Sequence, residues 1–222
     1  MPSPAAASPF DQSRYQVRLD WGSAGLARLA PADVVVVVDV LGPSAAVMAR
    51  PGAGDQVDAE RDGAAIAAAA AASGSLVLLG CLRNAAAVAD AVLREQQRRG
   101  ARTSIAVIAA GDQVARSGGV GSAEPGAPTG DAELRFAVED LLGAGAVVDA
   151  LSRRGIDHTS PEAAAACEAS RGLGGAVRHL LTASGSGQEL IAAGRRDEVL
   201  AAAELDVDSA VPALRDGVFA VA

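Results

Sequence analysis

The 222-residue sequence contains no lysine, so all 19 of its basic residues are arginine. This absence excludes lysine Schiff-base chemistry and the lysine of a phosphate-binding loop. An anionic substrate would have to be bound by arginine, by backbone amides or by a metal ion.

Aromatic residues are also scarce, with one Trp, one Tyr and three Phe in the whole chain. The core must therefore consist mainly of Ala, Val and Leu, with slender helices packed close together, and a surface on which bases stack is not expected. The formal net charge is −8, and no cluster of basic residues is available to grip a phosphate backbone. We expect no nucleic-acid partner.

Cysteine is scarce as well, and long uncharged apolar runs are missing. Cys81 and Cys167 are the only cysteines, which indicates reduced, buried thiols in place of a disulfide framework. The first residues, "MPSPAAASPFDQ", do not resemble a targeting signal, and no run is long enough to span a membrane. His158 and His179 lack metal-ligand spacing and are predicted to be surface or capping residues. The sequence predicts a cytoplasmic protein without a membrane partner, and it leaves a homo-oligomer open.

What the sequence does contain is a set of short apolar runs, the clearest of which is "VVVVVDVLG", Val34 to Gly42. A continuous apolar stretch is typical of a strand that is covered on both faces of a sheet. Central strands are predicted over residues 34–39, 75–81 and 103–109, and the alternating "RYQVRLDW" predicts an outer strand.

The segment between the second and third of these runs predicts a helix. It opens with a cap at Asn84, has apolar residues at helical spacing and stops at Gly100. Strand, helix and strand then form a βαβ unit with a parallel pair of strands. Asp62 and Gly63 mark a second helix entry, before "AAIAAAAAA".

The second half of the chain begins with residues 112–130, which are rich in Gly, Pro and Ser and predict a long loop. Asp131 is expected to cap a helix that extends to about residue 155, and short helices are expected over residues 160–203. A turn at Asp216 and Gly217 predicts a closing strand pair. The predicted organisation is a disordered lead over residues 1–12 and one α/β domain over residues 13–222, with a largely parallel central sheet flanked by helices.

Acidic residues stand where such a fold binds ligands. Asp39 follows the valine run, and open parallel sheets bind ligands beyond the carboxyl ends of their strands. The alternative is that Asp39 only caps the next turn. Adjacent helical residues point about 100° apart, so either Glu139 or Asp140 can face the sheet, and Asp140 is the stronger candidate because Glu139 has Arg135 four residues before it as a possible ion-pair partner. Arg83, with Asn84, offers an anion a guanidinium group and free amides at a strand-to-helix turn.

Several segments resemble, in order, the pattern of the 2-phosphosulfolactate phosphatase family. They include "DVVVVVDVLGPSAAV", "LLGCLRNAAAVADAVL", "IAVIAAGD", "LRFAVEDLLGAGAVVDAL" and "SGSGQELIAAGRRDEVL", and the resemblance extends from about Gln16 over nearly the whole chain. It implies a Mg²⁺-dependent phosphatase that converts a small anionic phosphate ester, 2-phosphosulfolactate, to sulfolactate, a step toward coenzyme M in methanogens.

The resemblance also implies roles for individual residues. Asp39 and Asp140 are the expected catalytic residues and Mg²⁺ ligands, and Asp39 is alternatively a nucleophile. The expected substrate-binding residues are Ser44, Arg83, Asn84, Gly111 and Glu139.

The sequence departs from the family pattern in three places. Gly42, Pro43, Ser44 and Ala45 stand where the family has an Arg-Ala-Thr-Thr type sequence, and Ala64 ends a turn that usually has Ser or Thr there. Several tens of residues are missing around residues 54–56. The alternative to an enzyme is therefore a homologue that has lost turnover and acts as a binding or scaffolding protein.

Overall fold

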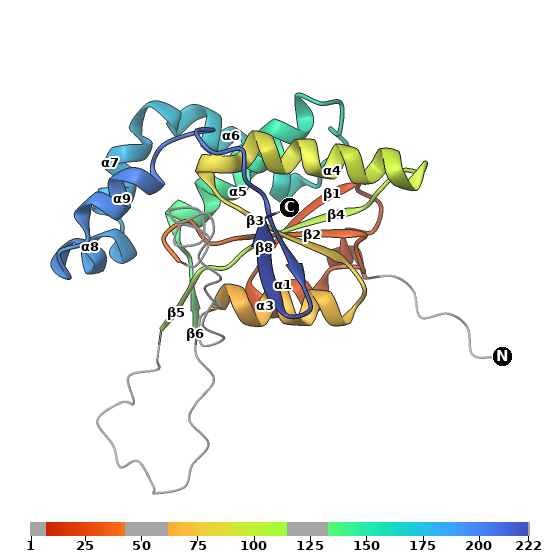
Figure 1. Cartoon of the computed structure of the whole chain (residues 1–222), viewed down its shortest axis with the longest axis horizontal. Coiled ribbons are helices and arrows are strands. Elements are labelled where there is room, and N and C mark those ends of the chain that lie inside the picture. Colours follow the sequence, from red (N-terminus) through yellow and green to blue (C-terminus); the bar gives the residue numbers. More distant parts are fainter. Residues whose placement is uncertain (1–7, 43–61, 115–132, 222) are drawn as a thin grey trace, which may run out of the picture.

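The computed structural model describes residues 8–42, 62–114 and 133–221. Its centre is a mixed, mostly parallel sheet of six strands in the order β1-β4-β2-β3-β7-β8, with helices on both faces (Figure 1). The first four strands in this order are parallel, and β7 and β8 add an antiparallel pair at one edge. This is the predicted α/β fold. The strands are β1 (Val17–Trp21), β2 (Val34–Val38), β3 (Leu76–Gly80), β4 (Ile105–Ala109), β7 (Pro212–Arg215) and β8 (Val218–Val221).

The valine run is the centre of the sheet, because β2 pairs with β4 on one side and β3 on the other. Val34, Val36 and Val38 belong to the core beneath α4, α5 and α6, whereas Val35 and Val37 belong to the core formed with α1 and α3. Every side chain of this strand is therefore buried, as its uninterrupted apolar sequence predicted.

Helices α1 and α3 cover one face of the sheet, α4, α5 and α6 cover the other, and α7, α8 and α9 lie to one side (Figure 1). The short C-terminal helices and the closing hairpin were both predicted, and Asp216 and Gly217 have the positive φ angles of a tight turn, 52° and 80°. The helices are α1 (Gly22–Arg28), α3 (Asp62–Ala72), α4 (Ala85–Arg99), α5 (Val138–Ser152), α6 (Pro161–Leu173), α7 (Val177–Ala183), α8 (Gly185–Ala192) and α9 (Arg196–Ala202), with 3₁₀ turns η1 (Pro9–Asp11), η2 (Leu82–Asn84) and η3 (Gly174–Ala176).

The βαβ unit forms with one refinement. Strands β3 and β4 are parallel but not adjacent, since β2 lies between them. Helix α4 begins after Asn84 and ends at Gly100, which has a φ of 63° and donates its N–H to Gln96 and Gln97. The helix begins and ends at the predicted residues, but the Asn84 side chain accepts the N–H of Cys81 and does not cap α4.

The expected long loop and the following helix start were wrong in part. Residues 112–114 form β5 (Asp112–Val114), which pairs antiparallel with β6 (Glu133–Arg135), and α5 begins only at Val138. Leu134 packs over Gly22 and Gly111, and the ring of Phe136 lies 5.1 Å from that of Trp21. These contacts stabilise an extended backbone at residues 133–136, although the sequence of this segment favours a helix. Asp131, the predicted cap, lies outside the described residues.

The start of the described chain lies inside the predicted disordered lead. Residues 9–11 form η1, and the side chain of Gln12 is buried. Its amide donates to the carbonyl of Leu19 at 2.9 Å and accepts the N–H of Leu19 at 3.1 Å. Gln12 therefore fastens this segment to β1.

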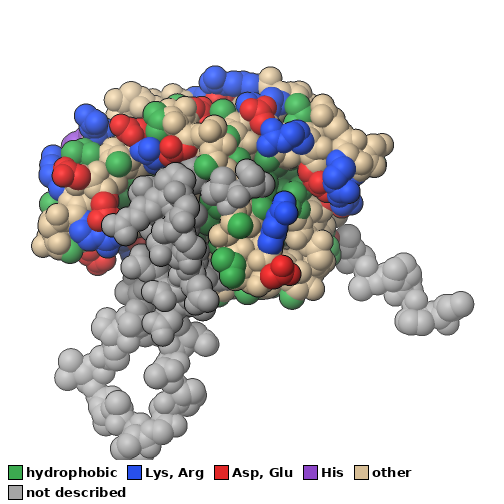
Figure 2. Space-filling model, in the orientation of Figure 1, with side chains coloured by type: hydrophobic (Ala, Val, Ile, Leu, Met, Phe, Trp, Pro, Cys, Tyr) green, Lys and Arg blue, Asp and Glu red, His purple; other side chains and the backbone are tan. Residues whose placement is uncertain are grey.

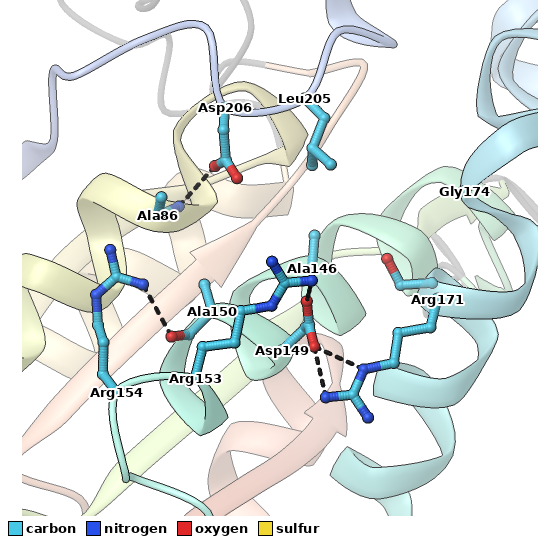
Figure 3. Close-up of a pocket in the computed structure, with 11 residues that line it drawn as sticks. Ala86, Ala146, Asp149, Ala150, Arg153, Arg154, Arg171, Gly174, Leu205 and Asp206 are labelled. Carbon is cyan, nitrogen blue, oxygen red and sulfur yellow. Dashed lines mark hydrogen bonds and ion pairs between the residues drawn. The ribbon is translucent and has the colours of Figure 1, made fainter.

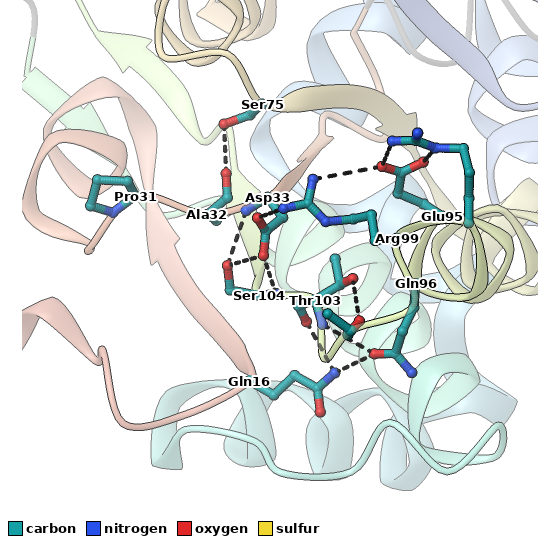
Figure 4. A network of polar contacts seen from close by, with 12 residues as sticks. Gln16, Pro31, Ala32, Asp33, Ser75, Glu95, Gln96, Arg99, Thr103 and Ser104 are labelled. Carbon is teal, nitrogen blue, oxygen red and sulfur yellow. Dashed lines mark hydrogen bonds and ion pairs between the residues drawn. The ribbon is translucent and has the colours of Figure 1, made fainter.

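A polar network closes the amino ends of the strands (Figure 4). Asp33, just before β2, accepts hydrogen bonds from the N–H and the hydroxyl of Ser104, both at 2.8 Å, and it also pairs with Arg99. Gln16, just before β1, donates to Gln96 at 2.7 Å. The residues that precede strands thus hold the strands in register.

Glycine permits close helix packing in this aromatic-poor core. A methyl group on Gly145 of α5 would lie 2.0 Å from the carbonyl oxygen of Ala166 in α6. Helices α5 and α6 therefore approach each other more closely than any larger residue at position 145 allows.

The surface seen in Figure 2 carries arginine and acidic side chains that are mixed together, without a large area of one sign. The longest helices of the described chain, α4 and α5, have 15 residues each, and none of the described helices is long and apolar enough to cross a membrane. Cys81 and Cys167 are free and buried, and His158 and His179 are exposed, as predicted.

Candidate functional site at the carboxyl edge of the sheet

Asp39 directly follows β2, at the carboxyl edge of the parallel strands. Its carboxylate lies against two glycines. A methyl group on Gly42 would lie 2.1 Å from both carboxylate oxygens, and one on Gly63 would lie 3.3 Å from Oδ2. Gly63 belongs to the first turn of α3, the predicted helix entry. The absence of side chains at these two positions leaves the room that this carboxylate occupies.

Asp140, in the first turn of α5, binds the same edge of the sheet. Its Oδ1 accepts the N–H of Val40 at 2.7 Å, and its Oδ2 accepts the N–H of Gly111 at 2.8 Å. The first of these N–H groups belongs to the peptide bond that follows Asp39, and the second follows the end of β4. Asp140 therefore fixes the backbone on which Asp39 stands.

The pKa of Asp140 is raised well above its ordinary value. Burial is the largest cause, and the negative charge of Asp39 is the next; the hydrogen bond from Val40 opposes them, Glu139 adds to the rise, and the bond from Gly111 again opposes it. Two carboxylates that disfavour each other's charge form an environment in which a cation is stabilised.

Glu139 is buried as well, with 2 % of its surface exposed against 3 % for Asp140. Within the described part of the chain, its Oε2 has no hydrogen-bond partner. The proposed pair with Arg135 is not formed, because Arg135 belongs to strand β6 and binds Asp112. An unpaired buried carboxylate oxygen is costly, so this atom is suited to a bound ligand.

This cost leads to a stability prediction. Glu139→Met removes the unpaired carboxylate at similar length, and we expect it to raise the free energy of unfolding by about 1 kcal/mol. The control is Glu168→Met, which removes an exposed ion pair with Arg171 and should change stability by less than about 0.5 kcal/mol. Denaturant unfolding of both variants measures the difference, and a loss of stability confined to Glu139→Met would contradict the prediction.

Arg83 is directed to the C-terminal segment. It forms ion pairs with Glu204 at 2.5 Å and Asp208 at 2.6 Å, and it donates to the carbonyl of Ala201 at 2.6 Å. After burial, which lowers its pKa, the hydrogen bonds and charges of Asp208 and Glu204 prevail and raise it. The structure thus uses the guanidinium of Arg83 to attach residues 201–208.

The Asn84 side chain is also used within the fold. Its Oδ1 accepts the N–H of Cys81 at 2.9 Å, and its Nδ2 donates to the carbonyl groups of Leu79 and Ala210 at 3.2 and 3.1 Å. Gly111, another predicted substrate-binding residue, donates its N–H to Asp140. Ser44 lies outside the described residues.

The residues at this edge suit Mg²⁺. Within the described ranges, no three acidic, histidine or cysteine side chains form a ready metal cage. Mg²⁺ does not require one, since it is usually bound by one or two carboxylates, substrate phosphate and several waters. Asp39 and Asp140 are the residues that would hold the ion through carboxylate oxygens, and the orphaned Oε2 of Glu139 lies in the same helix turn as Asp140.

The fold and the edge together define an α/β protein with a candidate acidic ligand site at the carboxyl ends of parallel strands. Residues 61–217 match the family model described as 2-phosphosulpholactate phosphatase, and the chain belongs to this family. The family is named for a phosphatase, so membership implies phosphoric ester hydrolysis. Asp140, Glu139 and Arg83 lie inside the matched range, whereas Asp39 precedes it. A search of curated proteins found no match.

Asp112 is a further acidic residue at this edge, and the sequence did not predict it. Asp112, next to Gly111, accepts hydrogen bonds from Ser186 of α8 with both oxygens at 3.0 Å and pairs with Arg135. Strands of three residues are too short for a periodicity signal. The only indication in the sequence was an aspartate at the end of an apolar strand.

Proposed function

We propose that the protein is a Mg²⁺-dependent phosphatase of a small anionic phosphate ester, with 2-phosphosulfolactate as its substrate. The observation that carries this proposal is the meeting of Asp39 and Asp140 at one edge of the sheet, in a chain of the phosphosulfolactate phosphatase family.

In this proposal the two aspartates have different tasks. Asp39 provides the carboxylate that faces the ligand, in a space cleared by Gly42 and Gly63. Asp140 shares the ion and positions Asp39 through the N–H of Val40. Bound Mg²⁺ supplies the positive charge that offsets the phosphoryl oxygens.

Glu139 contributes from the same helix turn. Its buried, unpartnered Oε2 is suited to a water or hydroxyl group that enters with the substrate. With Arg83 engaged elsewhere, backbone amides and a different arginine are left to bind the anionic oxygens of the substrate.

The test is phosphate release from 2-phosphosulfolactate and from simple phosphate monoesters, with and without Mg²⁺. We expect hydrolysis that is lost on chelation and restored by millimolar Mg²⁺, with activity reduced by the missing segment. Hydrolysis that persists in excess chelator would contradict the metal requirement. No release from any ester at high enzyme and Mg²⁺ concentrations would favour the non-catalytic homologue.

A further inference from the structure

The acidic edge of the sheet has an arginine at its rim, Arg135 of β6. We propose that Arg135 binds a second anionic group of the substrate, a carboxylate or sulfonate carried in addition to the phosphate. The inference rests on the proposed function, and it makes Arg135 the residue that distinguishes doubly acidic esters from simple ones.

The backbone of Arg135 lies next to Gly111, a residue that binds one of the acids. Gly111 donates its N–H to Asp140, and a methyl group on Gly111 would lie 2.9 Å from the carbonyl oxygen of Arg135. Asp112, the residue after Gly111, forms the ion pair with Arg135 and is its partner across the β5–β6 hairpin. The guanidinium and the acids are therefore connected through two neighbouring residues, Gly111, which binds Asp140, and Asp112, which binds Arg135.

The guanidinium is held in place and still accessible. Its Nη2 donates to Asp112, which Ser186 of α8 fixes through two hydrogen bonds. It also lies against Gly185, where a methyl group would come within 2.6 Å of Nη2. The side chain remains 48 % exposed, and the described chain provides no acceptor for its Nε and Nη1. A guanidinium presents such donors as a fork that fits carboxylate and sulfonate oxygens.

Other arginines line a cavity of about 300 Å³ formed by α4, α5, α6 and the segment after α9 (Figure 3), and one of them provides a control for Arg135. Its arginines are engaged by acids. Arg153 and Arg171 bind Asp149, which stands between them in Figure 3, and Arg154 binds Asp90 with two hydrogen bonds. Arg171 is 45 % exposed, close to the value for Arg135, and it provides a matched control.

The experiment compares Arg135→Ala, Arg135→Lys and Arg171→Ala on two substrates, 2-phosphosulfolactate and phenyl phosphate, which has no second acid. For Arg135→Ala we expect kcat/KM for 2-phosphosulfolactate to fall about 10²-fold, mainly through KM, and kcat/KM for phenyl phosphate to change less than about twofold. Arg135→Lys should recover part of the loss, since it keeps the charge without the fork. Arg171→Ala should behave as wild type.

Equal losses on both substrates would show a structural role, and unchanged kinetics on both would also overturn the proposal. Calorimetric titration with sulfolactate, which has carboxylate and sulfonate groups but no phosphate, tests Arg135 without turnover. We expect binding to weaken at least about tenfold in Arg135→Ala and to persist in Arg171→Ala. If the wild type hydrolyses no ester, the proposed function fails, but this titration still decides the role of Arg135. Equal binding by Arg135→Ala, or no binding by the wild type, would refute it.

Discussion

Asp39→Asn is expected to lower phosphate-ester hydrolysis by at least about 10²-fold and to leave the fold intact. The substitution keeps the shape of the side chain but removes the negative charge with which Asp39 would hold Mg²⁺ in the proposed function. Steady-state phosphate release and denaturant unfolding of the purified variant measure the two effects separately.

Asp33, at the opposite end of β2, provides the matched control. Burial opposes its ionisation, but the hydrogen bonds from Ser104 and the charge of Arg99 outweigh burial and lower its pKa. We expect Asp33→Asn to reduce the free energy of unfolding by about 1 to 2 kcal/mol and to retain activity. Because the pKa of Asp33 is lowered in the folded state, its contribution is present above its unfolded pKa and is lost as the pH falls through the folded pKa.

The two variants thus separate the functions of the two strand ends. Retained turnover in Asp39→Asn would show that Asp39 is only a cap, the alternative that the sequence left open. If Asp33→Asn lost activity at temperatures where it is fully folded, a shift of strand β2 would be enough to lower activity. The loss in Asp39→Asn could then not be assigned to the missing charge.

Gly145→Ala is expected to lower the free energy of unfolding by about 3 kcal/mol. The new methyl group would lie 2.0 Å from the carbonyl oxygen of Ala166 and 2.7 Å from Cβ of Ser170, so α5 and α6 must separate. The first obstacle is backbone, which cannot rotate away as a side chain can. Thermal and denaturant unfolding measure the loss.

The control for this prediction is Gly172→Ala, near the end of α6. Among the described residues, no atom lies within 4 Å of a methyl group at this position. Alanine should therefore stabilise the helix by up to about 1 kcal/mol, through its higher helix propensity. A Gly145→Ala variant as stable as Gly172→Ala would contradict the close approach of α5 and α6.

Arg83 and β6 differ from the sequence predictions for the same physical reason. Arg83 stands at a strand-to-helix turn typical of anion sites, but its partners, Glu204 and Asp208, lie more than a hundred residues later in the chain. Likewise, residues 133–135 have a local helical preference and form β6 because they pair with β5. The residues around Arg83 and around β6 do not indicate which distant segment each will pair with.

The sequence by itself determined the central strands, the position of Asp39 at their carboxyl edge and the turn at Asp216 and Gly217, because apolar runs and turn residues act over a few neighbouring positions. Only the tertiary structure decided that β2 lies between β3 and β4 and that Asp140 binds the N–H groups of Val40 and Gly111. It also decided that Arg83 pairs with Glu204 and Asp208, and that Arg135 pairs with Asp112. These outcomes depend on contacts between segments far apart in the chain, where packing and the pairing of buried charges select one partner among several that local sequence allows.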